Sequence, residues 1–436
     1  MTGSSLTWSE KAVTVPSGGI VSGRLRVPPS KSYTLRYLNL ALLAARPVEV
    51  RHPLAADDPE RFLAALETLG WSVERGDEAV RLAPPVEPVD EAMIDCGDCG
   101  TMFRLLAASL TTLPGRFTLG GSSRLMERPI APLVEALQRL GARVESGEDH
   151  GRGPLRIEGP SLGGGRTAID AGESSQFLSA VLMAGSRATE SVEIEVASLA
   201  SAPYVDVTLD AIERFGGRVE VLGTGRYRVH PGLAGTDSIE VPGDDSAAAY
   251  PAAAAALTGG DVVLEGLDPD SAQGDRRFLD LLREMGANVE RSGGGRHITV
   301  HGTGRLAAVD ADLSEIPDQV PTLAALAPFA RGTTRIRNVA HLRLKESDRL
   351  AAMAAELMRL GACVGQLDDG LEIEGTFASG EIHTDPVTVD PHGDHRIAMS
   401  LALVGLRRPG VTIMNPSVVS KSYPQFWSDL DRILGR

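Results

Sequence analysis

Leu66-Glu67-Thr68-Leu69-Gly70 is the first of six similar phrases in this chain of 436 residues. Each phrase has an apolar last turn and then a glycine, which is typical of a helix that ends in left-handed backbone geometry. The other five are Leu137–Gly141, Ile212–Gly216, Leu282–Gly286, Leu357–Gly361 and Leu430–Gly435. Successive glycines are 71, 75, 70, 75 and 74 residues apart, which predicts one supersecondary unit repeated six times.

Strand and helix patterns surround each phrase. A hairpin pattern follows five of the six glycines, as at Val73–Leu82, Val144–Ile157 and Val289–Val300. Upstream of each phrase lie another helix pattern rich in small residues and a short strand pattern. The unit is therefore predicted to be β-α-β-α-β-β, and the fold class α/β.

The sixth phrase reaches the end of the sequence without its hairpin, and the N-terminal segment offers one. Its arms are predicted at Ala12–Val15 and Arg24–Val27. We expect the two chain ends to complete one repeat together, with three repeats in each domain, because that number suits the usual domain size. The predicted domains are residues 1–28 with 243–436, and residues 29–242.

Composition argues against several classes of function. The net charge is −15, no basic stripe is present and aromatic residues make up 4% of the chain, so nucleic acid is not expected as a partner. No apolar run is long enough to span a membrane, and the first residues carry no secretory signal. We expect a cytoplasmic monomer.

The cysteines do not indicate a metal or redox centre. Cys96 and Cys99 form a Cys-x-x-Cys pair, but no second pair completes a zinc site, and reduced cysteines are the favoured interpretation. No P-loop, dinucleotide fingerprint, nucleophile elbow or His-Glu-x-x-His motif is present. We therefore expect no metal and no cofactor.

Lysine is rare, and its placement is informative. Four of the 43 basic residues are lysine, and Lys31, Lys345 and Lys421 stand just before apolar helical patterns. Because arginine serves elsewhere as the generic cation, lysine is expected where a compact ammonium group is needed. Within the stretch His341–Leu350, a helix would place Lys345 and Arg349 on one face. A solvated charged turn is the alternative interpretation of this stretch.

Charged and polar residues stand at the predicted starts of the repeated helices. First helices begin at Ser30-Lys31-Ser32, Cys99-Gly100-Thr101, Ser174-Ser175-Gln176, Asp244-Asp245-Ser246, Pro317-Asp318-Gln319 and Asp394-His395-Arg396, and second helices near Arg124–Arg128, Ser201–Tyr204, Lys345–Arg349 and Lys421. Capping explains the serines and aspartates. It does not explain the cations, which are unfavourable there unless an anion lies between them. We therefore predict a phosphate or carboxylate ligand on which two domains, hinged near Pro28 and Pro242, close.

Three acid–base candidates lie among these cations: Glu346, Asp318 and His395. Flanking lysines are expected to keep both carboxylates ionised as proton acceptors. Two interpretations of His395 stay open, an exposed or capping histidine and a catalytic one.

Taken in order, the motifs resemble those of the 5-enolpyruvylshikimate-3-phosphate synthase family. They are Pro29-Ser30-Lys31-Ser32 with Arg36, Gly100-Thr101 with Arg104, Arg124 with Glu127–Ile130, Ser174–Phe177, Ser201 with Pro203-Tyr204, Ile316–Asp318, Leu342–Arg349, Asp394–Arg396 and Lys421. The resemblance covers Pro29 to Lys421 and implies two similar domains, each an inside-out α/β barrel of three repeats, with the active site in the interdomain cleft. It also implies transfer of the enolpyruvyl group of phosphoenolpyruvate to the 5-hydroxyl of shikimate 3-phosphate by addition–elimination, with release of phosphate, in aromatic amino acid biosynthesis.

Matching positions imply the site residues. Shikimate 3-phosphate would be bound by Lys31, Ser32, Arg36, Ser174, Ser175, Gln176, Ser201, Tyr204, Asp318, His341 and Lys345. Phosphoenolpyruvate would be bound by Lys31, Gly100, Arg124, Gln176, Arg349, Arg396 and Lys421. The catalytic candidates are Asp318, Glu346, Lys31 and His395.

The sequence departs from the family pattern mainly at one loop. The family usually has Asn before the Gly-Thr motif and small or Met residues after it, whereas this chain has Asp98, Cys99, Met102 and Phe103. An inward-pointing carboxylate at Asp98 would repel phosphoenolpyruvate, so affinity for it and for the inhibitor glyphosate is expected to differ. His341 stands where some members have Asn.

Two alternative functions stay open at this point. The sister enolpyruvyl transferase that acts on UDP-N-acetylglucosamine shares the fold, but it opens with Lys-Asn and carries a loop cysteine. Here Ser32 follows Lys31, and the corresponding loop Ser123–Glu127 has no cysteine. The other alternative is a non-catalytic repeat scaffold that binds anionic partners, against which the lysine placement and the acid–base set argue.

Overall fold

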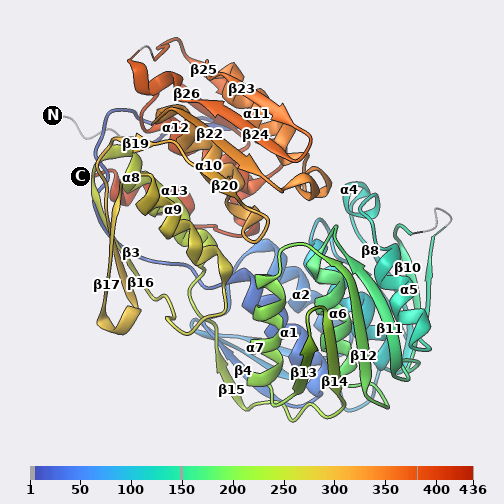
Figure 1. The fold of residues 1–436 in the computed structure, drawn as a ribbon. Coiled ribbons are helices and arrows are strands. Elements are labelled where there is room, and N and C mark those ends of the chain that lie inside the picture. Colours follow the sequence, from blue (N-terminus) through green and yellow to red (C-terminus); the bar gives the residue numbers. More distant parts are fainter. Residues whose placement is uncertain (1–4, 148–150, 381, 436) are drawn as a thin grey trace. The chain divides into compact units, whose positions relative to one another are not determined.

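The computed structural model describes residues 5–147, 151–380 and 382–435. Its contacts divide the chain into two compact units, Met1–Pro28 with Pro242–Arg436 (unit 1) and Pro29–Val241 (unit 2) (Figure 1). Within the described residues, no helix is both long and apolar enough to cross a membrane.

Each unit is built from four-stranded sheets that share one topology. Among the described residues there are six such sheets, and a seventh sheet pairs only β19 (Leu306–Ala307) with β21 (Ala330–Arg331). In the second repeat the chain runs β7 (Glu91–Asp95), α3 (Gly100–Ser109), β8 (Gly115–Gly120), α5 (Ala131–Arg139), β9 (Arg143–Ser146) and β10 (Leu155–Gly159). The sheet order is β7-β8-β10-β9, parallel between β7 and β8 and antiparallel elsewhere. The predicted β-α-β-α-β-β unit is confirmed.

The other five repeats follow the same plan. The first has α1 (Lys31–Ala44), β4 (Val48–Arg51), α2 (Asp57–Thr68), β5 (Ser72–Arg75) and β6 (Ala79–Ala83); the third has β11 (Gly165–Ala171), α6 (Ser175–Gly185), β12 (Val192–Leu199), α7 (Pro203–Arg214), β13 (Arg218–Gly223) and β14 (Arg226–His230). The fourth has α8 (Asp245–Thr258), β16 (Asp261–Glu265), α9 (Phe278–Glu284), β17 (Asn288–Ser292) and β18 (His297–His301); the fifth has β20 (Asp310–Asp312), α10 (Val320–Leu326), β22 (Thr333–Arg337), α11 (Arg349–Arg359), β23 (Val364–Leu367) and β24 (Gly370–Glu374). The sixth has β25 (Val387–Val389), α12 (His395–Gly405), β26 (Val411–Met414) and α13 (Phe426–Ile433).

Three repeats complete their sheets with strands from elsewhere in the chain. β15 (Ser238–Glu240) lies parallel to β4 and supplies the missing first strand of repeat one. β3 (Gly23–Arg26) does the same for repeat four, parallel to β16. β1 (Thr7–Trp8) and β2 (Ala12–Thr14) form the hairpin of repeat six, where β2 pairs with β26. The chain ends therefore meet as predicted.

The predicted N-terminal hairpin is wrong in its pairing. Ala12–Val15 and Arg24–Val27 were expected to pair with each other, but β2 and β3 belong to different sheets. The true partner of β2 is β1, a two-residue strand too short to be recognised from an alternating pattern. The boundary between units lies at Val241–Pro242, one residue before the predicted position.

The six glycines of the repeated phrase share a left-handed conformation. Gly70, Gly141, Gly216, Gly286, Gly361 and Gly435 have φ between 70° and 107°. In five of them two hydrogen bonds close the helix end; for α2, Gly70 N–H donates to Glu67 O at 2.9 Å and Trp71 N–H to Leu66 O at 2.9 Å. This is the Schellman motif, which satisfies carbonyls that the last helical turn leaves without partners.

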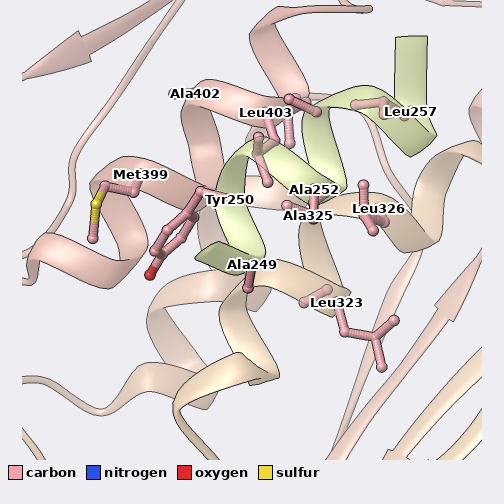
Figure 2. Close-up of a cluster of buried hydrophobic side chains, with 14 of the residues drawn as sticks. Ala249, Tyr250, Ala252, Leu257, Leu323, Ala325, Leu326, Met399, Ala402 and Leu403 are labelled. Atoms are coloured by element: carbon pink, nitrogen blue, oxygen red, sulfur yellow. The ribbon is translucent and has the colours of Figure 1, made fainter. Parts of the chain in front are cut away.

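Helices rich in small residues form the centre of each unit, as the inside-out description implies. α1, α3 and α6 are buried on nearly all sides in unit 2, and α8, α10 and α12 in unit 1. Figure 2 shows Ala252 of α8, Ala325 of α10 and Ala402 of α12 in one core, all fully buried. Alanine at these positions lets three helices approach closely while the sheets cover them.

The shared glycine conformation leads to a test of stability. Gly141→Ala should lower the free energy of unfolding by about 1 kcal/mol, because φ is +88° there and a β-carbon is disfavoured in that conformation. The added carbon would otherwise meet only ordinary contacts, the nearest at 3.6 Å. Gly365→Ala in β23, an exposed position without positive φ, is the matched control and should change stability by less than about 0.5 kcal/mol. Urea unfolding that shows equal effects would contradict this account.

Candidate active site

Side chains cap the first helices of five repeats, as predicted. Ser30, Cys99, Ser174, Asp244 and Asp394 each accept a hydrogen bond from a backbone N–H two or three residues further on. The residues that follow these caps include several of the predicted site residues. Capping thus brings polar side chains to the first turn of five of the buried helices.

One prediction within the stretch His341–Leu350 is wrong, the shared helical face of Lys345 and Arg349, whereas the helix does begin within the predicted range. Lys345 has an extended backbone after a 3-10 helix at Ala340–Leu344, and α11 begins only at Arg349. Lys345 and Arg349 therefore do not share a helical face. The reason is Asp348, whose side chain accepts from Ala351 N–H and sets the helix start one residue later.

Two predicted helix starts differ from the structure. Lys421 ends a 3-10 helix at Pro416–Lys421, and α13 begins at Phe426. Asp318 lies in a 3-10 turn at Pro317–Gln319, directly ahead of α10.

In unit 1 the predicted residues come together in a cluster of opposite charges, which we call cluster I. Its members are Asp318, Glu346, Arg349, Asp394, Arg396 and Lys421. The guanidinium of Arg349 is 2% exposed and lies at the centre. It donates to Asp394 at 2.7 Å, to Asp318 at 2.8 Å and to Glu346 at 3.0 Å.

The charges of cluster I shift the pKa values of its members. Burial alone would lower the pKa of Arg349, but its carboxylate partners outweigh burial and raise it, Asp394 most strongly. Burial alone would raise the pKa of Asp318. The charges of Arg396 and Arg349, followed by that of Lys345, outweigh burial and hold this pKa well below the usual range. Asp318 is therefore ionised, as predicted, with arginines contributing more than the lysine.

Arg396 and Lys421 complete cluster I. Arg396 Nη2 donates to Asp318 at 2.7 Å, and its Nη1 donates to Ser246 Oγ at 2.6 Å. Lys421 Nζ lies 3.4 Å from the Glu346 carboxylate, which is 15% exposed. Glu346 is thus placed between two cations, Arg349 and Lys421.

Both histidines predicted for the site lie in unit 1. His395 is the first residue of α12 and 1% exposed, so the interpretation as an exposed histidine is wrong. Burial, followed by the charge of Lys345, lowers the pKa of His341 to about 4. His341 is therefore neutral near pH 7 and suited to a hydrogen bond rather than to ionic attraction.

In unit 2 we group two sets of contacts as cluster II: the pair Lys31 and Asp58 at the starts of α1 and α2, and the group Gly100, Arg104, Arg128 and Gln176 around the start of α3. Lys31 Nζ lies 3.4 Å from Asp58, whose side chain is 6% exposed. Arg104 Nη1 donates to Gln176 Oε1 at 2.9 Å, and Gln176 Nε2 donates to Thr101 at 2.9 Å.

The start of α3 is packed beneath two guanidinium groups. A β-carbon added to Gly100 would lie 2.6 Å from Arg104 Nη1 and 2.7 Å from Arg128 Nη1. Arg128 is 7% exposed, and its Nε has no hydrogen-bond partner among the described residues. Only glycine leaves room for these groups, and together with the helix N-terminus they make a strongly positive site.

Arg124, predicted to bind phosphoenolpyruvate, occupies a different environment. Its side chain is 44% exposed and lies 3.5 Å from Glu127 in the short helix α4 (Ser123–Met126). Asp98 is exposed and accepts a hydrogen bond from Ser122, the cap of α4. Asp98 therefore links the loop before Gly100 to the helix that carries Arg124.

The residues predicted for shikimate 3-phosphate in unit 2 gather at the starts of α1, α6 and α7. Arg36 is buried and donates to Thr208 at 2.8 Å, to Tyr204 O at 2.9 Å and to Ser32 O at 3.0 Å. Burial lowers the pKa of Arg36 to about 10, so it stays charged near neutral pH. Ser174, Ser175 and Ser201 are buried at adjoining helix starts, and Ser201 has a φ of +57°.

The structure revises the reason for placing cations at helix starts. The sequence interpretation required an external anion between them, but the protein's own carboxylates neutralise most of these cations. Asp58 forms an ion pair with Lys31, and Asp318 forms ion pairs with both Arg349 and Arg396. An incoming anion must therefore compete with internal ion pairs.

Sequence reasoning did not assign a role to Asp58, Arg104 or Asp394. Asp58 stands in the first turn of α2 beside Asp57, where acidic residues are ordinary and give no functional signal. Arg104 and Asp394 belong to quoted motifs, but their contacts with Gln176 and Arg349 join distant parts of the chain.

Comparison with known proteins gives a consistent result. Residues 15–430 match the family model described as EPSP synthase (3-phosphoshikimate 1-carboxyvinyltransferase). The chain is 46% identical over 431 residues to the 3-phosphoshikimate 1-carboxyvinyltransferase of Syntrophobacter fumaroxidans, covering 96% of this chain and 98% of that one. It is 43% identical over 424 residues to that of Methanoculleus marisnigri, covering 96% and 98%. The structure resembles that of EPSP synthase from Acinetobacter baumannii with a TM-score of 0.79 and 28% identity over 98% of both chains.

The two roles of Asp394 lead to a second test of stability. Asp394→Ala should lower the free energy of unfolding by about 3–5 kcal/mol, because it removes the cap of α12 and leaves the buried Arg349 short of a partner. Asp348→Ala is the matched control, since Asp348 caps α11 but is 38% exposed, and should cost about 1 kcal/mol. Urea unfolding at pH 7 measures both. A similar cost for the two variants would show that the ion pair with Arg349 contributes little.

Proposed function

This chain belongs to the EPSP synthase family, and on that premise we propose how clusters I and II carry out the family's reaction. The enzyme transfers the enolpyruvyl group of phosphoenolpyruvate to the 5-hydroxyl of shikimate 3-phosphate and releases phosphate, a step of aromatic amino acid biosynthesis. One observation carries the proposal: Arg349 and Arg396 both pair with Asp318 at a nearly buried site.

Cluster I is proposed to bind phosphoenolpyruvate by exchange of ion-pair partners. The carboxylate and phosphate of this substrate would form ion pairs with Arg349, Arg396 and Lys421. In the structure these cations are paired with Asp318 and Glu346. Arginine binds both kinds of anion through paired hydrogen bonds. Each cation keeps an anionic partner in the exchange, but Asp318 and Glu346 lose cationic ones, so substrate binding must supply the free energy of separating these pairs.

The same exchange would activate the proton acceptor. Asp318 is a weak base while two guanidinium groups hold its pKa down. Once substrate anions draw these cations away, its pKa rises toward the ordinary value, and it becomes able to accept the proton of the 5-hydroxyl. The oxygen then bonds to the enol carbon of phosphoenolpyruvate.

The remaining proton transfers are assigned to Glu346 and Lys31. During the addition, the methylene carbon of phosphoenolpyruvate gains a proton and becomes a methyl group. During the elimination, the adduct loses phosphate together with one proton of that methyl group. Glu346 lies between Arg349 and Lys421, and Lys31 beside Asp58, so each has a charged neighbour that stabilises one of its two forms. His395, buried beside Asp394, is proposed to position Arg396.

Shikimate 3-phosphate is proposed to bind at the starts of α1, α6 and α7. The proposed ligands are Lys31, Ser32, Arg36, Ser174, Ser175, Gln176, Ser201 and Tyr204 of unit 2, with Asp318, His341 and Lys345 of unit 1. Hydroxyl groups and helix N-termini suit a phosphate and a ring with several hydroxyls. Neutral His341 would donate one hydrogen bond.

We replace Arg124 by Arg128 in the proposed phosphoenolpyruvate site. Arg128 is 7% exposed against Gly100 and has an unsatisfied Nε, whereas Arg124 is 44% exposed and beside Glu127. A buried guanidinium at a helix N-terminus binds an anion more strongly than an exposed one, because water screens it less.

This replacement yields a kinetic prediction. Arg128→Ala should raise the KM for phosphoenolpyruvate by about 10- to 100-fold, since a charge-assisted hydrogen bond is worth about 1.5–3 kcal/mol. Arg124→Ala, the matched control four residues away, should raise it by less than about threefold. Steady-state kinetics would measure the KM of each variant, and an unchanged melting temperature would show that each variant folds normally. The opposite order would restore Arg124 to the site.

The carboxylate at Asp98 yields a second kinetic prediction. Asp98→Asn should lower the KM for phosphoenolpyruvate about twofold to fivefold at low salt, because it removes a negative charge near Gly100 while the amide oxygen still accepts from Ser122. The difference should vanish at 1 M salt, where charges are screened over about 3 Å. Glu91→Gln, a similarly exposed carboxylate on β7, is the control and should change nothing. A difference that persists at high salt would mean that Asp98 acts through structure instead of charge.

Phosphate release tests the function itself. The enzyme should release phosphate from phosphoenolpyruvate with shikimate 3-phosphate as acceptor, and not with UDP-N-acetylglucosamine. Release with the second acceptor would identify the sister transferase activity. Binding of phosphoenolpyruvate without release under either condition would support a non-catalytic scaffold. A monomeric state in the cytoplasm stays a prediction, and light scattering in solution would test the first part.

A further inference from the structure

A buried carboxyl group, which was not among the predicted site residues, is connected to cluster I by hydrogen bonds. Asp275 belongs to the 3-10 helix Gly274–Arg277 and is 5% exposed. Gln319 Nε2 donates to Asp275 Oδ1 at 2.9 Å and to Ser246 Oγ at 3.1 Å. Arg396 Nη1 donates to the same Ser246 Oγ at 2.6 Å. A chain of buried hydrogen bonds thus connects Asp275 to Arg396.

Burial, followed by nearby negative charge, makes the ionised form of Asp275 unfavourable. Asp244, the cap of α8, and Asp318 of the 3-10 turn before α10 bring negative charge, and Arg396 of α12 brings positive charge. Arg276, the next residue, pairs with Asp245 at 3.0 Å. Burial, followed by the charge of Asp318, raises the pKa of Asp275 to about 7.

We propose that Asp275 positions Arg396 through Gln319 and Ser246, and that its carboxyl group takes up one proton when phosphoenolpyruvate binds. This inference rests on the proposed role of Arg396 in binding that substrate. The proton comes from solvent and forms an O–H bond on the Asp275 carboxylate, so one negative charge is removed as the anion arrives.

Electrostatics gives the direction of this coupling. Phosphoenolpyruvate adds negative charge next to Arg396, the cation that favours ionised Asp275. The electrostatic potential at Asp275 becomes more negative, which stabilises the protonated form of its carboxyl group. A protonated carboxyl group still accepts from Gln319 through its carbonyl oxygen, so the chain that holds Arg396 stays intact.

The pH dependence follows from the same linkage. Below pH 6 Asp275 is protonated in the free and the bound enzyme, and binding moves no proton. Above pH 8 the free enzyme holds the carboxylate and must take up a proton to bind. Apparent affinity for phosphoenolpyruvate therefore falls as pH rises through about 7, the pKa of Asp275.

Asp275→Asn tests the proposal, because asparagine resembles the protonated acid and does not titrate. The ratio of kcat/KM for phosphoenolpyruvate, variant over wild type, should rise about fivefold to tenfold between pH 6 and pH 8.5. Asp245→Asn is the matched control: Asp245 is also buried, with a pKa raised to about 6, but it pairs with Arg276 outside the chain to Arg396. Its ratio should stay constant over the same range. A constant ratio for Asp275→Asn would overturn proton uptake, whatever the variant's absolute activity.

A second measurement uses the wild type and does not depend on how the variant folds. Calorimetric titration with phosphoenolpyruvate at pH 8, in HEPES and in Tris, reports proton exchange as a difference between the two enthalpies. We expect uptake of about half a proton or more, and no uptake would overturn the proposal. Arg396→Ala separates this inference from the proposed function: an unchanged KM for phosphoenolpyruvate would refute the role of Arg396. A large increase in that KM, with no proton uptake in the wild type, would refute the role of Asp275 alone.

Discussion

The buried guanidinium of Arg349 is the group on which the arrangement of unit 1 depends. It connects the start of α11 to the cap of α12 through Asp394 and to the turn before α10 through Asp318. Buried ion pairs of this kind add little net stability, because desolvation offsets their attraction. Their effect is to fix one arrangement, since any other arrangement leaves a buried charge without a partner. The same property makes the group suited to function, because a substrate anion can replace one carboxylate partner.

The two clusters differ in how their cations are neutralised. Cluster I mixes three cations with three carboxylates, so its charge is balanced and its pKa values are strongly shifted. Cluster II places Arg104 and Arg128 over Gly100 at the start of α3, with Asp58 beside Lys31. In the first, anion binding means exchange of partners. In the second, it means occupation of a positive site that a helix N-terminus and a missing side chain create.

Much of the fold could be predicted, because the signal recurs. Six glycines in left-handed geometry end six helices, and a single-sequence period near 70 residues reveals them. The exchange of β3 and β15 between distant repeats could not be predicted, since short strands pair through backbone hydrogen bonds that carry no side-chain signature. For the same reason the N-terminal hairpin was assigned to the wrong partner. Lys345 and Arg349 were wrongly expected on one helical face because Asp348, a common residue in charged stretches, caps α11 and leaves Lys345 outside the helix.

The sequence by itself determined the repeat, five of the six first-helix starts with their caps, the family and most of the residues that gather in each cluster. These follow from local periodicity and from motifs, which are properties of neighbouring residues. The tertiary structure alone decided which charge faces which. Asp58 faces Lys31, Asp394 faces Arg349, and Asp275 reaches Arg396 through Gln319 and Ser246. Such pairings join residues tens to hundreds of positions apart, and their strength depends on burial, which no stretch of sequence specifies.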